Sequence, residues 1–393
     1  MITFTVQYLG TRPKNVTPKE VRERLREAFQ RLPISMVLLD WDLPPALEEA
    51  VAEETRAHSA KLYRWQTWLT GDSHTDLPSE WAVIGLNGRP ISGYANDPDF
   101  TFICPNRASV EEFLAERLDA IVSRGLFQGI FLDRIRFPSP AAKPEVNLGC
   151  FCRHCMHLAA DQGFDLEAAR LHILKKVKEK KGSASFCRSL FGQLENMNDP
   201  FERLLKFRQD SISRVVESAQ RQAKASAVEV GLDCFSPILT AMVGQDLHAL
   251  GRHADWVKIM TYPRVFGPAG ISFELLDLLD WLTNHGHSEI QALHLIQESS
   301  GLPLPPNRIE LRQSGLDSKT VDLEIRRGRA QGLKNLFAGI ALVEVKNVHE
   351  STTEQIRADL AASQRSDGLV LSWDLWQIPL EYLDMIRRQW EIR

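Results

Sequence analysis

The stretch Gly129-Ile130-Phe131-Leu132-Asp133-Arg134-Ile135-Arg136-Phe137-Pro138 decides the predicted fold. An apolar run of strand length ends here in an acid, two arginines and a proline, with a helix-like segment before it and a cysteine cluster after it. A central barrel strand presents a carboxylate to a pocket in this way. The alternative is that Asp133 is a buried structural acid paired with Arg134 or Arg136.

Strand-like and helix-like segments alternate along the chain, which favours a parallel α/β fold. Eight strands are predicted, over residues 2–9, 35–43, 61–69, 128–137, 228–235, 255–262, 338–345 and 368–375. Eight strand–helix units fit one (β/α)8 TIM barrel over residues 1–393, with a zinc-binding insertion of one or two helices over 139–199, after strand 4. An open doubly wound sheet is the alternative, but no glycine-rich phosphate loop follows the first strand.

Composition and charge narrow the classes of partner. The formal net charge is -4, from 51 acids against 47 bases, so no basic excess points to nucleic acid. The first nine residues alternate like a strand and lack the pattern of a signal peptide. No segment reaches the ~18 apolar residues of a membrane span. We therefore expect a cytoplasmic protein with neither a nucleic-acid nor a membrane partner, and the oligomeric state stays open.

The predicted strand ends are rich in acids and aromatic side chains, which a barrel would gather at one pocket. The acids are Asp40, Asp42, Asp133, Asp233, Glu344 and Asp374, and the aromatic residues are Trp41, Trp65, Trp68, Tyr262, Trp373 and Trp376. Burying carboxylates costs several kcal/mol each unless they are paired or used. Their number therefore favours a functional site.

Two carboxylates beside aromatic platforms suit glycosidic bond cleavage, in which one acid protonates the leaving oxygen while the other attacks the sugar or activates water. We expect Asp133 to be catalytic, as nucleophile or general acid, with Glu344 as the first choice of partner and Asp233 as the second. The predicted contacts to a carbohydrate substrate are Asp40, Trp65, Arg136, Tyr262, Trp373 and Asp374.

Four of the six cysteines have metal-ligand spacing. Cys150, Cys152 and Cys155 fall within six residues, and in a barrel Cys104 lies in the neighbouring loop. Four thiolates at ~2.3 Å from one zinc ion form a closed structural site. The alternatives are unconnected free thiols, or His154 or His157 in place of one cysteine.

This cysteine pattern resembles that of the glycoside hydrolase family 42 β-galactosidases, and residues 129–138 resemble a segment of uncharacterised glycoside-hydrolase-like barrels. The resemblance covers residues 104–155 and implies a structural zinc beside the active-site mouth. It also implies a nucleophilic Glu at the end of the seventh strand, for which Glu344 is the nearest counterpart. The family carries Asn-Glu at the end of the fourth strand, where this chain has Leu132-Asp133. Asp133 is also similar to the fourth-strand nucleophile of α-amylase-type hydrolases.

Two other functions compete with a glycoside hydrolase or transglycosidase. The first is a carbohydrate-binding or scaffold barrel that keeps the fold and the zinc without catalysis. The second is a metal-dependent hydrolase, which is disfavoured because the histidines form no His-Glu-x-x-His motif.

Overall fold

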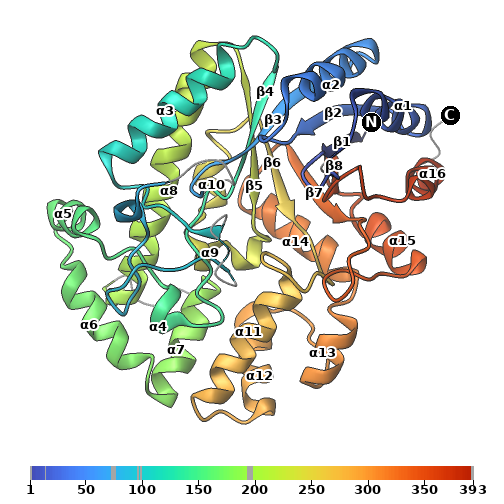
Figure 1. Ribbon diagram of the computed structural model, residues 1–393. Helices are drawn as coiled ribbons and strands as arrows, with labels where there is room; N and C mark the ends of the chain where they lie inside the picture. The colour runs from blue at the N-terminus through green and yellow to red at the C-terminus, as the bar shows by residue number, and fades with distance from the viewer. Residues whose placement is uncertain are drawn as a thin grey trace.

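The computed structural model describes residues 2–13, 15–71, 77–94, 97, 100–192 and 198–390. Eight parallel strands pair in chain order and close into a barrel, which confirms the predicted (β/α)8 fold (Figure 1). The strands are β1 (Thr3–Tyr8), β2 (Ile34–Leu39), β3 (Lys61–Thr67), β4 (Gly129–Asp133), β5 (Glu229–Cys234), β6 (Trp256–Met260), β7 (Leu336–Ala341) and β8 (Gly368–Ser372).

The helices surround this barrel and follow its strands in the chain. They are α1 (Pro18–Arg31), α2 (Pro45–Ala57), α3 (Ala108–Val122), α4 (Pro144–Asn147), α5 (Arg153–Asp161), α6 (Leu166–Lys176), α7 (Lys180–Leu190), α8 (Pro200–Ala225), α9 (Thr240–Val243), α10 (Leu247–Leu250), α11 (Ile271–Asn284), α12 (Glu289–Ser300), α13 (Arg308–Ser314), α14 (Lys319–Ala330), α15 (Thr353–Ala362) and α16 (Leu380–Gln389). Within the described ranges, no helix combines the length and the apolar character needed to cross a bilayer.

Local sequence signals explain where the long helices begin. Thr17 and Glu20 form a capping box at the start of α1, in which each side chain binds the other residue's backbone N–H. At the start of α8 the Asp199 side chain accepts from the N–H of Phe201, and Pro200 occupies the first turn. Both devices satisfy or remove N–H groups that the first turn leaves unpaired.

The predicted strands extended too far at their carboxyl ends. The seventh was expected at 338–345, but β7 ends at Ala341, so Glu344 lies beyond the ladder. The reason is that Leu342 and Val343 remain fully buried after the strand has ended. The same happens after β4, where Ile135 and Phe137 are buried outside the sheet. Hydrophobic patterning reports burial, which continues in the loops, and not strand pairing.

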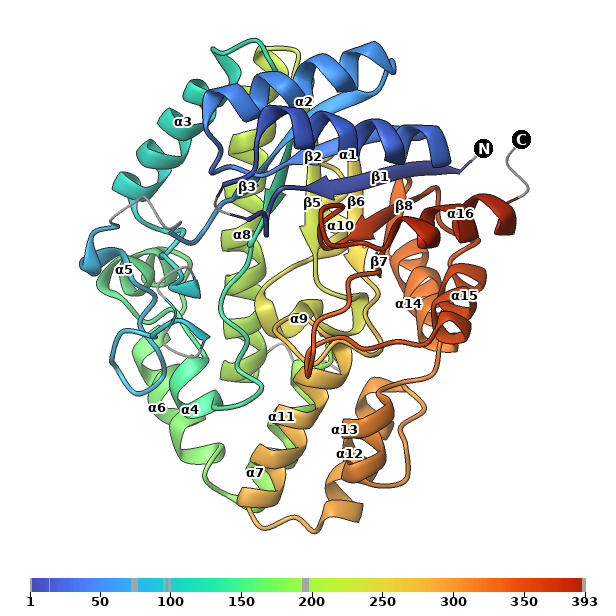
Figure 2. The same ribbon diagram turned by 45° about the vertical axis from the view of Figure 1, so that its right-hand side comes forward.

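The segment between β4 and α8 contains four helices in its described part, α4 to α7, where one or two were expected. Helix α7 packs against α11 and α12, with the rings of Phe186 and Trp281 5.4 Å apart. The indole N–H of Trp281 donates to Glu145 of α4 at 2.8 Å. Figures 1 and 2 show α4 to α7 and α11 to α13 extending from the barrel on the same side. Two distant inserted segments thus support each other.

Large side chains fill the barrel interior. The inner cluster consists of Met36, Leu38, Tyr63, Phe131, Trp256, Phe337 and Val370. The rings of Phe131 and Trp256 stack with centroids 5.1 Å apart. Gly231 lies against the same indole, so that a Cβ at position 231 would be 2.4 Å from a Trp256 ring atom. The barrel therefore needs a glycine at this position to accommodate the tryptophan.

This packing predicts the effect of adding one methyl group. Gly231→Ala should lower the free energy of unfolding by about 1–3 kcal/mol, because the new Cβ displaces the indole from a filled interior. Denaturant unfolding of Gly231→Ala, Trp256→Phe and the double variant measures it. The double variant should lose less stability than the two single losses added, since the smaller ring makes room for the methyl. Simple additivity would show that the two residues do not compete for space.

Candidate active site and cysteine cluster

A polar layer lies above the apolar interior, at the carboxyl ends of the strands. Side chains alternate along a strand, so the residues two positions beyond the apolar layer also point inward. Lys258 donates to Asp233 Oδ2 at 2.9 Å and to Gln7 Oε1 at 3.2 Å. Ser372 donates to the same Gln7 oxygen at 2.7 Å. Strands β1, β5, β6 and β8 therefore share one buried hydrogen-bond network.

Asp133 ends β4 and is half-buried. Its Oδ2 accepts from the indole N–H of Trp65 at 3.1 Å, and its Oδ1 accepts from the backbone N–H of Arg134 at 2.6 Å. Arg134 has a φ of 55°, in the left-handed region that non-glycine residues rarely adopt. The backbone thus turns sharply at the carboxylate, which is held by two N–H donors while part of it faces solvent.

Asp233 is only 4% exposed, and its Oδ1 has no hydrogen-bond partner among the described residues. Burial raises the pKa of Asp233 to about 7; the charge of Lys258 opposes the shift and that of Asp133 adds to it. The two aspartates therefore interact, and they sit in contrasting surroundings. One carboxyl group is partly solvated and hydrogen-bonded by N–H groups, and the other is desolvated.

Arg136 connects this pair with a neighbouring cavity. Its guanidinium lies over the rings of Phe102 and Phe235, at 4.5 and 4.6 Å from their centroids. Burial lowers the pKa of Arg136 to about 10, while the charges of Glu274, Asp133 and Asp233 favour its cationic form. The cavity has a volume of about 420 Å³, and Glu274 also lines it. Arg136 thus interacts electrostatically with both predicted aspartates.

Aromatic side chains are placed near the polar layer. Tyr262 is buried, its ring lies 5.6 Å from Lys258 Nζ, and it meets Trp373 edge to face at 6.3 Å. Trp65 meets Trp41 edge to face at 5.6 Å. Trp65, Trp41 and Trp373 are each partly exposed. Their partly exposed ring faces can contact a ligand from solvent.

Asp40 and Asp374 differ in how their oxygens are used. Asp374 accepts four hydrogen bonds, from the backbone N–H groups of Leu9, Thr11 and Trp376 and from the Thr11 hydroxyl. Asp40 forms one ion pair with Arg12 at 3.5 Å, and its Oδ1 is unpartnered within the described chain. Burial raises the pKa of Asp40 to about 7, against the opposing charge of Arg12. Asp374 thus orders the loops after β1 and β8, whereas Asp40 keeps a free acceptor.

Glu344 lies apart from this group. It is exposed, and its Oε1 accepts from the Tyr382 hydroxyl of α16 at 2.5 Å. The structure groups five of the residues discussed above: Asp133, Asp233, Arg136, Tyr262 and Lys258. Glu344 faces α16 instead. This placement follows from the shorter β7 strand.

Sequence analysis did not identify Lys258 or Gln7. Lys258 is the charged residue in the apolar strand Trp256-Val257-Lys258-Ile259-Met260, and Gln7 is a polar residue in the strand Phe4-Thr5-Val6-Gln7-Tyr8. The sequence could have indicated Lys258 as a functional residue, because a charge in a buried strand needs a partner.

Trp68, expected among the aromatic residues at the strand ends, is not at the mouth. It is 1% exposed and lines a cavity between the outer helices. It follows β3 directly, and its backbone N–H donates to the carbonyl of Asp133 at 2.8 Å. The Trp68 side chain therefore points away from the barrel axis, while its backbone continues the hydrogen bonding between β3 and β4.

The sulfur atoms of Cys104, Cys150, Cys152 and Cys155 all lie within 4.8 Å of one another, and all four residues are buried. Cys104 Sγ is 3.6 Å from Cys152 Sγ and 3.4 Å from Cys155 Sγ. A tetrahedral zinc with Zn–S bonds of ~2.3 Å separates its ligands by about 3.8 Å. The donor set and its spacing therefore fit a four-thiolate metal site.

N–H donors face the sulfur atoms of this cluster. The backbone N–H of Ile84 donates to Cys150 Sγ at 3.4 Å, and the Asn106 amide donates to Cys155 Sγ at 3.3 Å. Such donors stabilise negative charge on sulfur and orient metal ligands. The cluster also joins the segment after β3 to the segment after β4, since Phe151 N–H donates to Ile84 O at 2.9 Å.

Comparisons of the sequence with protein-family models and with curated proteins find no match. Among solved structures, a β-galactosidase from the psychrophilic Marinomonas ef1 is similar, with a TM-score of 0.57 and 10% identity over 99% of this chain and 60% of that chain. A class V chitinase from Pseudomonas fluorescens Pf-5 gives a TM-score of 0.49 and 12% identity over 99% of this chain and 100% of that chain. The PgaB glycoside hydrolase domain from Bordetella bronchiseptica gives a TM-score of 0.40 and 12% identity over 86% of this chain and 94% of that chain. The similarity to the β-galactosidase shows a shared fold.

Proposed function

We propose that this protein cleaves or transfers glycosidic bonds at the carboxyl-terminal mouth of its barrel. The observation that carries the proposal is the pair of interacting carboxyl groups, Asp133 and Asp233, in contrasting surroundings. Glycoside chemistry needs one carboxyl group that holds a proton and one that is ionised. The desolvation of Asp233 and the partly solvated position of Asp133 support this division of roles.

In this proposal Asp233 is the general acid and Asp133 the ionised partner. The raised pKa of Asp233, about 7, keeps its proton available near neutral pH. Asp233 gives this proton to the glycosidic oxygen as the bond from that oxygen to the anomeric carbon breaks. Asp133 either attacks the anomeric carbon or takes a proton from the water that attacks it. Asp233 replaces Glu344 as the preferred partner, because Glu344 is exposed and bound by Tyr382.

The remaining predicted contacts have distinct roles in this proposal. Trp65 and Trp373 offer partly exposed ring faces, which stack on the apolar faces of sugars. Arg136, Asp40 and Tyr262 are polar side chains at the same mouth, and each is available to orient hydroxyl groups. Asp374 contributes indirectly, because its four hydrogen bonds hold the loops after β1 and β8.

A non-catalytic carbohydrate-binding barrel is the second candidate. The observation that favours it is the buried ion pair between Asp233 and Lys258, in which Asp233 is 4% and Lys258 1% exposed. In that case Asp233 neutralises a lysine and donates no proton. Substitution of the two aspartates distinguishes the candidates.

We further propose that the four cysteines hold one structural zinc ion. Four ligands close the coordination shell, so the zinc offers no open position for a substrate. Its function would be to fasten the segment after β4 to the segment after β3, because binding stabilises only the ordered arrangement.

Replacing the predicted catalytic carboxyl groups tests the enzyme function. Purified protein is first screened against aryl glycosides, and kcat/KM is then measured on a cleaved substrate. Asp133→Asn and Asp233→Asn should each lower kcat/KM by about 10²–10⁴-fold, since each loses a proton-transfer or nucleophilic group. Glu344→Gln is the matched control and should keep near-normal activity. A large loss in Glu344→Gln with full activity in Asp233→Asn would restore Glu344 as the partner, and full activity in Asp133→Asn would contradict the mechanism.

The pKa of Asp233 predicts how activity depends on pH. Because the raised pKa of about 7 means that the proton is bound below this pH and lost above it, kcat/KM should fall as pH rises through about 7. Lys258, Asp133 and Arg136 are the charged groups that act on this carboxyl group. The residual activity of Asp233→Asn should lack this alkaline decline. A decline that persists unchanged in the variant would assign it to another group.

Metal analysis tests the cysteine cluster. Freshly purified, reduced protein should contain one zinc per chain by elemental analysis, and Cys104→Ser should contain less because one of four ligands is weakened. Cys187→Ser is the control, since Cys187 is also buried but lies outside the cluster. Zinc-free protein, or equal zinc in Cys104→Ser and the control, would rule out the site.

A further inference from the structure

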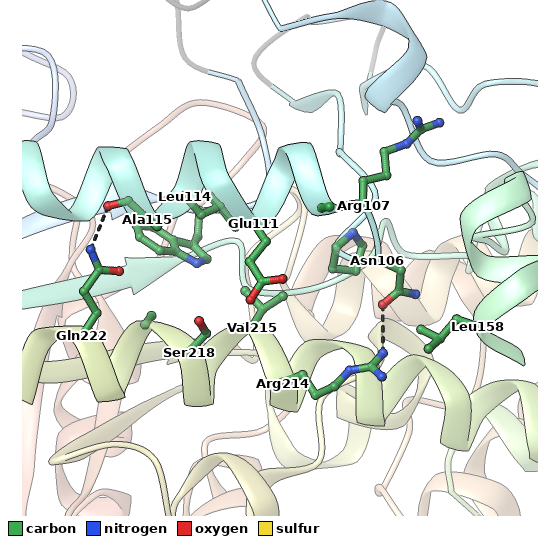
Figure 3. Close-up of a pocket in the computed structure, with 14 residues that line it drawn as sticks. Asn106, Arg107, Glu111, Leu114, Ala115, Leu158, Arg214, Val215, Ser218 and Gln222 are labelled. Carbon is green, nitrogen blue, oxygen red and sulfur yellow. Dashed lines mark hydrogen bonds between the residues drawn. The ribbon is translucent and has the colours of Figure 1, made fainter. Parts of the chain in front are cut away.

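A second cavity lies outside the barrel, between α3 and α8 (Figure 3). Its volume is about 300 Å³, at the small end of the range for ligand sites. The lining residues are Trp68, Pro105, Asn106, Arg107, Ala108, Glu111, Leu114, Ala115, Leu158, Arg214, Val215, Ser218, Ala219 and Gln222. A volume of this size suits one aromatic ring with a short substituent.

Trp68 gives this cavity an unused hydrogen-bond donor. The side chain is 1% exposed, and its indole N–H has no partner among the residues that the structure describes. A buried donor without an acceptor is unfavourable, and native proteins pair nearly all of them. Leu114, Val215 and Ala219 contribute an aliphatic wall to the cavity, so the N–H lies beside apolar surface.

The polar side chains at the cavity are largely engaged or balanced in charge. Gln222 donates to the carbonyl of Ala115 at 2.9 Å, and Arg214 donates to Asn106 Oδ1 at 3.0 Å, as the dashed lines in Figure 3 mark. Figure 3 shows Glu111 reaching from α3 into the space between the two helices, so one carboxylate accompanies the Arg214 guanidinium. Arg107 also lines the cavity, but Figure 3 shows its side chain extending away from the space between α3 and α8. Glu111 and Arg214 are therefore the charged side chains that face this space, and their opposite charges favour an uncharged ligand.

We propose that this cavity binds a small uncharged molecule with an aromatic or aliphatic body and one carbonyl-type acceptor. The acceptor receives the Trp68 indole N–H, and the body displaces water from the aliphatic wall. The gain comes from burying apolar surface and from satisfying a donor that is otherwise unpaired. This inference is independent of the proposed glycoside chemistry, since the cavity lies outside the barrel mouth.

The cavity is also next to both candidate sites. The backbone N–H of Trp68 donates to the carbonyl of Asp133 at 2.8 Å, and Asn106 donates to Cys155 Sγ at 3.3 Å. One wall of the cavity is thus bonded to the strand end that carries Asp133, and another to the cysteine cluster.

Three probes of matched size test the proposal on the full chain. They are acetophenone, which has a carbonyl acceptor, isopropenylbenzene, which has nearly the same shape without one, and benzoate, which is charged. Binding is followed through the indole N–H resonances in a ¹H–¹⁵N correlation spectrum, in which Trp68→Phe identifies the Trp68 signal by its loss. Acetophenone should shift the Trp68 signal downfield with saturation and bind more tightly than isopropenylbenzene or benzoate.

Two variants distinguish the contribution of the Trp68 N–H to binding from that of the cavity volume. Trp68→Phe should weaken acetophenone binding, measured by calorimetry, by about 2- to 12-fold and leave isopropenylbenzene nearly unchanged, since a neutral hydrogen bond contributes that much. Ala115→Phe, which fills the cavity from the half-buried face of α3, should abolish binding of every probe while thermal unfolding stays cooperative. The proposal is overturned if no probe binds saturably to the wild type, if Trp68→Phe binds acetophenone unchanged, or if Ala115→Phe still binds.

Discussion

The closure of eight parallel strands into a barrel is the constraint on which the rest of the molecule depends. Closure pairs every strand with two neighbours, so no sheet edge is left open. It also forces alternate side chains of each strand into one shared interior. The inner cluster around Phe131 and Trp256 fills the barrel interior below the strand ends. Gly231 has no side chain and so leaves room for the Trp256 indole. Above it, the same alternation places Lys258, Asp233 and Gln7 in contact.

That polar layer is costly to form, because both members of the Asp233–Lys258 pair lose their hydration. Removing one member would leave the other charge buried without a partner, so the two are mutually dependent. The arrangement leaves Asp233 Oδ1 without a hydrogen bond within the described chain. In the proposed function, the carboxyl group with this unpartnered oxygen is the general acid, and the partly exposed Asp133 is its partner. Breaking the network would therefore destabilise the barrel, and the same groups take part in the proposed chemistry.

The segments after β3 and β4 are organised around the cysteine cluster. Asn106 binds Cys155 and also accepts from Arg214 of α8, so the cluster is linked to the helix layer. Trp68 is linked through its backbone to Asp133. Direct hydrogen bonds therefore link the outer cavity to Asp133 and to the cysteine cluster, and all three lie after β3 or β4.

The sequence by itself determined the order of the eight strands, the closed barrel, and the acid at the end of β4, but not the number of helices after β4. Those features follow from local periodicity and from capping residues such as Thr17 and Asp199, which act within a few positions of the chain. The cluster of Cys150, Cys152 and Cys155 was also evident from their short spacing in the sequence. Cys104 could be assigned to the same cluster because neighbouring strands of a barrel bring their following loops together.

Tertiary structure alone decided which acids meet. Leu342 and Val343 are as buried as strand residues, so no sequence pattern could show that β7 ends at Ala341 and leaves Glu344 beyond the strand, where it is exposed and accepts from Tyr382. The partnership of Asp233 with Lys258 joins two strands, and the four donors to Asp374 include groups from the opposite end of the chain. Trp68 could not be assigned to the outer cavity either, because its direction depends on where β3 ends. Burial and hydrogen bonding between distant segments are properties of the closed barrel, and local patterns do not contain them.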